Sequence, residues 1–282
     1  MRIIDAHVHF SNIQALRQGA QEAGVEYTAR GFSEECFDNG VIGCVCMGLS
    51  ETAPGLTPDK LAITPMGADL APPPLPMGIC LGINPHTLDS SAVAEIKNMI
   101  ALQNDIVGFK IYAGYYHVDV NDAAYEPVFK LACEYGLPVA IHGGDTYFKG
   151  GLLEYSHPLR FDRLAYTYPD LKIVICHMGF PWIMDACIIA AKNDNVYVDI
   201  SGLSEGDAAE CDSLRTQPLY RDYYKQGLMF LDDYKKVIFG TDWPLTPIGP
   251  YIELCKELVP QTTWEDVFYN NAVGVYGNGM FQ

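Results

Sequence analysis

The chain has 282 residues, of which 49% are hydrophobic and 19% are charged. This length suits one large α/β domain, and the excess of apolar over charged residues excludes an intrinsically disordered chain. The 18 basic and 35 acidic residues give a formal net charge of −17. Proteins that bind nucleic acids or anionic membrane surfaces need a basic face, so we expect neither as a partner.

Nine cysteines occur without a CxxC pair. Zinc fingers and disulfide scaffolds need paired, repeating spacings, which this set lacks. Cys44, Cys46 and Cys176 lie in apolar runs, so we interpret them as small buried hydrophobic residues. Nine free thiols, no signal peptide in MRIIDAHVHF and no run of about 18 apolar residues together predict a cytoplasmic protein without a membrane span.

Short apolar runs rich in Val and Ile alternate with helical patterns along the whole chain. The runs cover 2–9, 41–47, 77–83, 106–112, 137–142, 171–177, 195–200 and 236–242. Helices are expected at 11–24, 31–39, 90–103, 121–135, 157–168, 181–193, 218–233 and 250–258, with a last one near 263–276. Near-continuous apolar strands are typical of a parallel sheet covered on both faces. Eight β–α units therefore predict a single-domain (β/α)8 TIM barrel over 1–282.

A doubly wound open sheet is the alternative architecture. Such a sheet usually carries a glycine-rich turn after its first strand, where HVHF stands in this sequence.

One segment interrupts the pattern. Residues 50–76 hold seven of the eighteen prolines, and proline stops helices and removes backbone donors. We expect a long loop after the second strand, either as a lid over the barrel mouth or as an oligomer contact.

The first strand carries two histidines on one face. Alternate side chains of a strand point the same way, so His7 and His9 lie about 6.5–7 Å apart along it. They stand at its carboxyl end, where barrel active sites form. Two imidazoles so placed can reach one ion, and buried, hydrogen-bonded core histidines are the alternative.

Polar residues also close three later runs, namely His142, His177 and Asp242. By alternation, Ala140 shares a face with His142, Ile173 and Ile175 share one with His177, and Ile238 and Gly240 share one with Asp242. Imidazoles and a carboxylate that converge on one rim without partners of their own need a cation. This donor set suits one divalent metal ion, with zinc as the best candidate and Mn, Fe or Ni as alternatives.

These residues resemble the metal-dependent amidohydrolase superfamily, and within it the amidohydrolase-related (amidohydrolase 2) branch. The matching stretches are DAHVH at 5–9, GFKIY at 108–112, AIHGG at 140–144, HPLRFDRLAYTYPDLKIVICHMG at 157–179, FGTDWP at 239–244 and YNNAVGVYG at 269–277. They span the chain from end to end. The resemblance implies a (β/α)8 barrel, in agreement with the strand count.

In that branch two histidines of the first strand, one of the fifth and an aspartate of the eighth usually hold one metal. The resemblance therefore implies His7, His9, His142 and Asp242 as ligands, with His177 beside the metal-bound water or the substrate. The metal can lower the pKa of a bound water to about 7 and polarise a carbonyl. Asp242 can then take a proton from that water, and His177 can transfer a second one or, alternatively, only orient the substrate.

Lys110 ends the fourth strand on the face of Gly108 and Tyr112. Elsewhere in the superfamily a lysine at this place is carboxylated and bridges two metals, whereas in the related branch it more often stays an ordinary lysine. We expect a charged Lys110 that orients the substrate or a ligand, with a metal bridge and a structural salt bridge as alternatives. Asp5 is expected to be a buried structural carboxylate.

Aromatic residues follow several of the same strand ends. We predict that Tyr112, Trp182 and Trp243 contact a small substrate, although packing of loops against helices would explain them equally well. His86, just after the third strand, is a reserve candidate for a substrate contact.

We therefore expect a metal-dependent hydrolase that cleaves a small-molecule ester, lactone or amide with a metal-activated water. The first alternative is a non-oxidative decarboxylase of a small aromatic or unsaturated acid, as are several relatives in this branch. It needs a cation for the leaving carboxylate, for which Arg160, Arg163 and Lys110 are the candidates. The second alternative is a catalytically silent binding barrel, against which the five retained metal-site residues argue. Because relatives often dimerise, a homodimer is the expected assembly if the chain associates.

Overall fold

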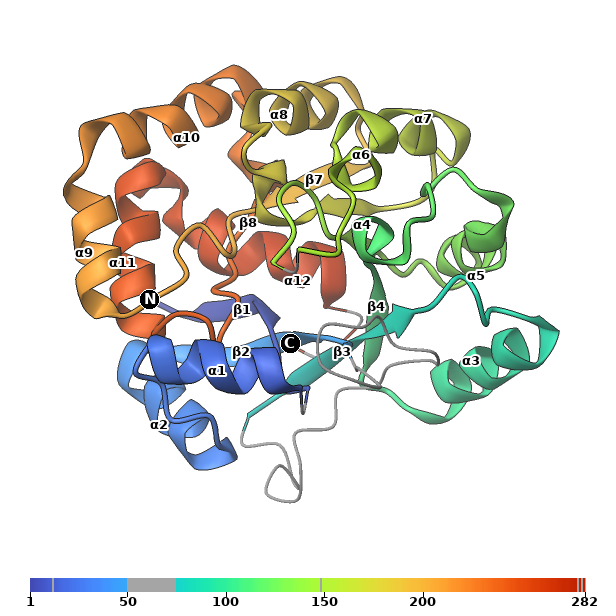
Figure 1. The fold of residues 1–282 in the computed structure, drawn as a ribbon, viewed down its shortest axis with the longest axis horizontal. Helices are drawn as coiled ribbons and strands as arrows, with labels where there is room; N and C mark the ends of the chain where they lie inside the picture. Colours follow the sequence, from blue (N-terminus) through green and yellow to red (C-terminus); the bar gives the residue numbers. More distant parts are fainter. Residues whose placement is uncertain (12, 50–74, 148, 278, 280, 282) are drawn as a thin grey trace.

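The eight strands pair in the order in which they occur along the chain, and every pair is parallel (Figure 1). They are β1 (Ile3–Val8), β2 (Val41–Met47), β3 (Met77–Ile83), β4 (Ile106–Ile111), β5 (Val139–Ile141), β6 (Ile173–Ile175), β7 (Val196–Asp199) and β8 (Val237–Ile238). The last strand returns to the first, because a parallel bridge joins Val8 and Trp243 and the N–H of Ala6 donates to the carbonyl of Phe239 at 3.0 Å. The predicted (β/α)8 TIM barrel is confirmed.

The computed structural model describes residues 1–11, 13–49, 75–147, 149–277, 279 and 281. The proline-rich loop predicted over 50–76 lies outside these residues except for its last two positions. Within the described part of the chain, no helix has the length and apolar character needed to cross a lipid bilayer.

Helices surround the barrel, and each described connection between strands other than that from β2 to β3 contains at least one helix (Figure 1). They are α1 (Gln14–Glu22), α2 (Ala29–Asn39), α3 (Ser90–Leu102), α4 (Ala113–Tyr116), α5 (Glu126–Tyr135), α6 (Leu153–Ser156), α7 (Leu159–Thr167), α8 (Ile183–Lys192), α9 (Ala208–Thr216), α10 (Pro218–Leu231), α11 (Ile248–Leu258) and α12 (Asn271–Tyr276). Every helix expected from the sequence has a counterpart, and α4, α6 and α9 are additional. Helix α9 buries Cys211 alone, so it shows no apolar period, and the capping carboxylate of Asp207 defines its start.

Strand residues alternate between two apolar layers. In β5, for example, Val139 and Ile141 pack in the outer layer against the helices, whereas Ala140 packs inside the barrel. Residues of α12, including Tyr276, join the interior cluster. The cysteines that we interpreted as buried hydrophobic residues are indeed buried. These two layers hold the strands rigidly, and their carboxyl ends therefore form a fixed platform for a site.

The predicted alternation fails in one strand. Ile173 and Ile175 lie in the outer layer, while Val174 and Cys176 lie inside the barrel, so His177 does not share the face of the two isoleucines. The physical reason is that β6 ends at Ile175 and that His177 adopts a left-handed backbone with φ 58°, which breaks the two-residue period. The turn nevertheless brings the His177 side chain to the site.

Candidate active site

A cavity of about 910 Å³ opens at the carboxyl ends of the strands. Its lining includes residues that follow seven of the eight strands: His9, Leu49, Tyr112, His142, His177, Glu205 and Asp242. In a (β/α)8 barrel this end carries the active site, so the cavity is the candidate site of the protein.

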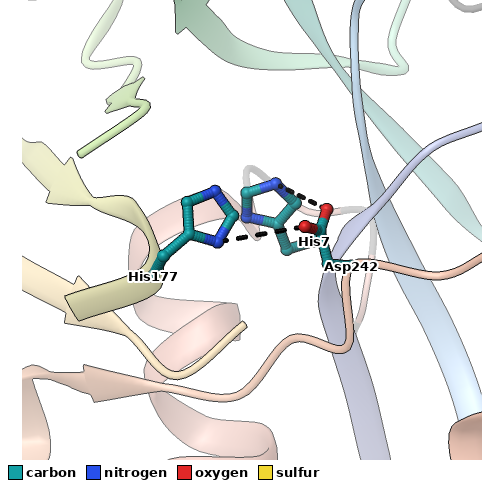
Figure 2. A group of neighbouring side chains, drawn as sticks. All are labelled: His7, His177 and Asp242. Atoms are coloured by element: carbon teal, nitrogen blue, oxygen red, sulfur yellow. Dashed lines mark ion pairs between the residues drawn. The ribbon is translucent and has the colours of Figure 1, made fainter. Parts of the chain in front are cut away.

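Ligating atoms of His7, His177 and Asp242 converge at the floor of this cavity, all within 4.8 Å of one another (Figure 2). Oδ1 of Asp242 lies 3.4 Å from Nε2 of His7 and 3.0 Å from Nε2 of His9, and Oδ2 lies 4.0 Å from Nδ1 of His177. Although Oδ1 is buried, it accepts no well-aligned hydrogen bond from any described residue. A buried carboxylate oxygen that faces ring nitrogens in this way is suited to a divalent cation, and the donor set matches zinc or a similar metal.

The electrostatics of the floor favour ligation. Burial and then the neighbouring charge of Lys110 lower the pKa of His7 to about 3, so its imidazole stays neutral. Burial tends to raise the pKa of Asp242, but the imidazoles of His7, His9 and His177 outweigh it and hold that pKa well below its usual range. Neutral imidazoles beside an ionised carboxylate are the protonation states that metal binding requires.

His142, the predicted fourth ligand, reaches this group through His177. Its Nδ1 lies 3.2 Å from Nε2 of His177, and its Nε2 lies 2.7 Å from the carbonyl oxygen of Asp145 and 3.4 Å from the hydroxyl of Tyr115. The structure thus brings His142 to the site without grouping it with the nitrogen and oxygen atoms at the floor. Its role as a ligand stays a prediction.

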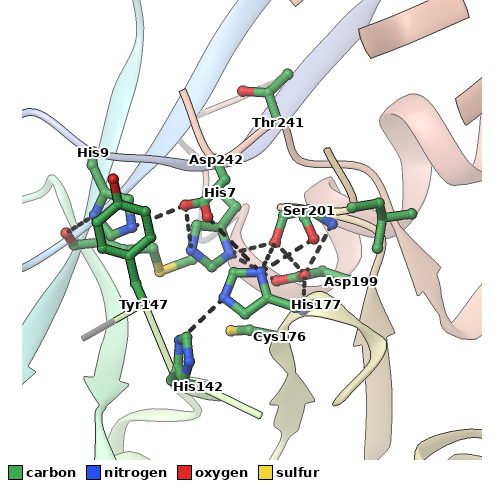
Figure 3. A network of polar contacts seen from close by, with 12 residues as sticks. His7, His9, His142, Tyr147, Cys176, His177, Asp199, Ser201, Thr241 and Asp242 are labelled. Atoms are coloured by element: carbon green, nitrogen blue, oxygen red, sulfur yellow. Dashed lines mark hydrogen bonds and ion pairs between the residues drawn. The ribbon is translucent and has the colours of Figure 1, made fainter. Parts of the chain in front are cut away.

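The sequence analysis missed Asp199, a buried residue at the end of β7. Its Oδ2 lies 2.9 Å from Nδ1 of His7 (Figure 3). Its Oδ1 accepts hydrogen bonds from the backbone N–H of His177 at 2.8 Å and from the hydroxyl of Ser201 at 2.5 Å. Asp199 therefore orients both histidines. The signal was present, because Asp199 is a polar residue one position before the end of the apolar run 195–200.

A glycine makes the close approach of these groups possible. Gly202 has φ +59°, and a Cβ there would lie 2.7 Å from Nδ1 of His177 and 2.9 Å from Oδ2 of Asp242. A side chain at this position would displace both groups, so the conformation and the space both call for glycine.

Lys110 is fully buried beneath the floor. Its Nζ lies 3.0 Å from Sγ of Cys176 and 3.4 Å from Nε2 of His7. This position suits the expected role of orienting a ligand, namely His7, better than contact with a substrate.

The predicted aromatic contacts divide into two groups. Tyr112 lines the cavity, and its ring lies parallel to that of His142 at 6.2 Å. Neither tryptophan is part of the lining. Trp243 is fully buried against Phe10 and other rings, and Trp182 packs on an imidazole away from the site. Ordinary packing, the alternative that the sequence left open, accounts for both tryptophans.

Asp5 and His86, two further candidates from the sequence, make contacts that support the fold and do not line the cavity. Asp5 accepts hydrogen bonds from the N–H and the hydroxyl of Thr241 at 2.9 and 2.6 Å, and so ties β1 to the turn after β8. Burial raises its pKa to about 7. His86, the reserve candidate, places Nε2 3.0 Å from the carbonyl oxygen of Tyr116 and is not part of the cavity lining.

The buried histidines predict loss of stability in acid. Burial is the main cause that lowers the pKa of His7, His142 and His177. Their contribution is complete above about pH 6.5, where the unfolded imidazoles are neutral, and is lost as pH falls toward the folded pKa values. The raised pKa values of Asp5, Glu35 and Glu205 act in the opposite sense. On going from pH 7.5 to pH 5.5, the three imidazoles should therefore lower the free energy of unfolding of the metal-free protein in urea, while the three carboxyl groups raise it.

Replacement of His142 by asparagine isolates one imidazole. The variant should lose less stability, or gain more, than the unsubstituted protein between pH 7.5 and pH 5.5, by up to about 1.4 kcal/mol per pH unit. Replacement of the exposed His117 by glutamine is the control and should leave the slope unchanged. The same pH dependence in His142→Asn and in the unsubstituted protein would contradict the buried, neutral state of the His142 imidazole.

The site is expected to hold one metal ion rather than two. A second group of donors, His7, Cys176 and Asp199, also lies within 4.8 Å. However, Asp199 is engaged by Nδ1 of His7, and Nζ of Lys110 occupies the space beside Cys176. Elemental mass spectrometry of protein purified without added metal or chelator should give about one equivalent per chain. Two equivalents, with a carboxylated Lys110 in the intact mass, would contradict this assignment.

The family model described as Amidohydrolase matches residues 4–277. Among curated proteins, no sequence matches this chain.

Solved structures resemble the chain over almost its whole length. An uncharacterised TIM-barrel protein from Bordetella bronchiseptica has a TM-score of 0.73 and 20% identity, with 99% of each chain covered. A probable 2-pyrone-4,6-dicarboxylic acid hydrolase from Acinetobacter baumannii has a TM-score of 0.62 and 15% identity, with 98% of this chain and 100% of that chain covered. A 5-carboxyvanillate decarboxylase from Sphingomonas paucimobilis has a TM-score of 0.61 and 18% identity, with 98% and 99% covered. At these identities the likeness establishes the fold.

Proposed function

Because the chain belongs to the amidohydrolase family, we propose that it hydrolyses an ester, lactone or amide bond of a small molecule at the floor of the cavity. One divalent ion would be held by His7, His9 and Asp242, with His142 as the fourth ligand. The observation that carries this proposal is the buried Oδ1 of Asp242, which faces two ring nitrogens and has no well-aligned hydrogen bond among the described residues.

The side chains of the floor have distinct tasks in this reaction. A bound divalent ion would lower the pKa of a water molecule and polarise the carbonyl of the substrate. Asp242 is ionised and accepts the proton of the attacking water. His177, whose pKa burial lowers, is neutral and lies 4.0 Å from Asp242, so it can relay that proton to the leaving group. Asp199 accepts a hydrogen bond from Nδ1–H of His7, which would leave the Nε2 lone pair available to a divalent ion.

Decarboxylation of a small aromatic or unsaturated acid is the second candidate. The position of His177 favours it, because this imidazole, after taking up a proton, could donate it to the carbon that loses the carboxylate. The cations proposed for this reaction are engaged elsewhere. Arg160 pairs with Asp119 at 2.8 Å, Arg163 is exposed, and Lys110 faces Cys176 and His7. Hydrolysis therefore remains the first candidate.

The remaining features of the proposal rest on composition and chemistry. Zinc fits a site of imidazoles and one carboxylate best, with Mn, Fe or Ni as alternatives. The nine free cysteines, eight of them buried, support a reducing compartment such as the cytoplasm. We further propose a single domain over 1–282, a small-molecule substrate, no nucleic-acid partner and, if the chain associates, a homodimer.

Product analysis with the zinc-loaded protein tests the reaction. We expect acid release, followed by pH-stat titration, from a panel of aryl esters, lactones and anilides, without CO₂. The same preparation should release no CO₂ from hydroxybenzoates or muconate-type acids. Release of CO₂ without hydrolysis would establish the second candidate instead, and tight binding without turnover on either panel would indicate a silent barrel.

A further inference from the structure

The wall of the cavity above the floor is largely aromatic and aliphatic. The rings of Tyr115, Tyr147, Phe180 and Tyr224 face it together with aliphatic side chains such as Leu245. Rings and aliphatic groups bind a flat apolar body by contact area and exclude water from it. The body of the substrate should therefore be aromatic or otherwise hydrophobic.

The charged side chains of the same wall share one sign. Aside from the histidines, the charged residues of the described lining are the carboxylates Asp145, Glu205, Glu210 and Asp242. The wall and its carboxylates also affect the pKa of one of these carboxyl groups, that of Glu205. Desolvation by the surrounding wall, and then the negative charges of Asp242 and Asp145, raise the pKa of Glu205 to about 7.

Lysine and arginine side chains of the described chain lie outside the lining. Arg17 follows the lining residue Leu16 and Lys149 precedes the lining residue Gly150, but both are exposed and neither lines the cavity. Beneath the floor, Nζ of Lys110 is directed at Cys176 and His7. A divalent ion at the floor would offset negative charge only at the bond that reacts.

We propose that the cavity selects a substrate with a hydrophobic, preferably aromatic body whose end remote from the reacting bond is cationic or uncharged, and that it discriminates against a remote carboxylate. This substrate class rests on the proposed function for its reaction. A remote carboxylate would enter among Asp145, Glu205 and Glu210, which are exposed at the mouth of the cavity, and these like charges would repel it. A remote amine would instead meet carboxylates and the π-faces of Tyr115 and Tyr147.

The cavity is built to take a ligand independently of its acidic wall. Its floor presents Oδ1 of Asp242, a buried oxygen without a well-aligned hydrogen bond among the described residues, from a side chain that is 8% exposed. A ligand anchored there extends toward the aromatic wall, and its remote end lies among the carboxylates. The anchor and the discriminating wall can therefore be tested separately.

The experiment uses three 4-substituted benzohydroxamates, whose common hydroxamate head binds the metal while the 4-substituent is aminomethyl, methyl or carboxyl. Isothermal titration calorimetry on the zinc-loaded protein should give the weakest binding for the carboxyl compound, by about tenfold or more relative to the aminomethyl compound. The difference should narrow at high salt, because ionic screening weakens exposed charge interactions. Binding of the carboxyl compound equal to or tighter than that of the aminomethyl compound overturns the proposal, as does failure of all three to bind.

Variants assign the effect to the wall. The double substitution Asp145→Asn with Glu205→Gln should reduce the difference between the aminomethyl and carboxyl compounds severalfold, and Glu205→Lys should reduce it further. The control Glu95→Gln, at an exposed position of α3, should leave the difference unchanged. If neither wall variant alters the difference, the proposal is wrong.

Turnover of the matching methyl 4-substituted benzoates separates this inference from the reaction. Hydroxamates that bind in the expected order, without hydrolysis of any of the esters, would contradict the proposed hydrolase activity. They would still support the proposed preference for a remote end that is cationic or uncharged.

Discussion

Substitution of Asp242 by asparagine should lower kcat/KM by about 10²–10⁴-fold, the range expected for loss of a general base, and should also reduce the metal content. The amide keeps the size of the side chain but replaces the anionic oxygen that faces the Nε2 atoms of His7 and His9. Asparagine is the informative replacement because Asp242 has φ 71°, a left-handed conformation that asparagine adopts readily. The measurements are steady-state kinetics on the hydrolysed ester and elemental analysis of the same samples.

A matched control exists on the surface. Asp232, at the end of α10, is also left-handed, with φ 50°, and it is exposed. Asp232→Asn should therefore leave activity and metal content as they are, so a loss confined to Asp242→Asn cannot come from the backbone conformation. Full activity with a full metal complement in Asp242→Asn would remove Asp242 from both roles.

The position of the site could be predicted from the sequence, because most of its residues obey a single rule about where polar residues occur in barrel strands. Parallel strands in a barrel are apolar along their length, so a polar residue that closes an apolar run lies at the carboxyl rim. His9, His142 and Asp242 follow this rule, and all three line the cavity. Asp199 obeys it as well, and it could have been found by applying the rule to the seventh run.

Other features depend on contacts that no local pattern encodes. The left-handed backbone of His177 changes the face to which its side chain belongs, and a two-residue period cannot anticipate such a turn. Trp243 follows a site residue directly, but it packs inward on Phe10 and Phe32 because the chain turns after Asp242. Glu205 lies in a connection between β7 and α9, where sequence spacing carries no information about which cavity a side chain will line.

Asp199 shows how the missed residues complete the predicted ones. A buried carboxylate needs hydrogen-bond donors, and Asp199 receives them from the ring of His7, the backbone of His177 and the hydroxyl of Ser201. Burial tends to raise its pKa, but the electrostatic interaction and the hydrogen bond with the ring of His7 outweigh that effect and lower it. Asp199 thus holds both His7, the proposed ligand, and His177, the proposed proton-transfer group, so one buried carboxylate couples the positions of the two imidazoles.

Substitution of His177 by asparagine separates proton transfer from metal binding. Asparagine tolerates the φ of 58° at this position, so the change removes the imidazole without adding backbone strain. If His177 transfers a proton, kcat should fall by about 10²–10⁴-fold while the metal content stays near that of the unsubstituted protein. Steady-state kinetics and elemental analysis on one preparation give both values.

The alternative for His177 follows from its place in the group of converging donors, since Nδ1 lies 4.0 Å from Oδ2 of Asp242. Were His177 a ligand, the asparagine variant would lose metal in parallel with activity, and added zinc would restore part of both. His117 is a second left-handed histidine, with φ 55°, and is exposed at the cavity lining, so His117→Asn controls for the same exchange in folding and metal content. Activity lost with metal retained in His177→Asn, with folding and metal content unchanged in His117→Asn, assigns the imidazole of His177 to proton transfer, because ligation and backbone conformation then no longer account for the loss.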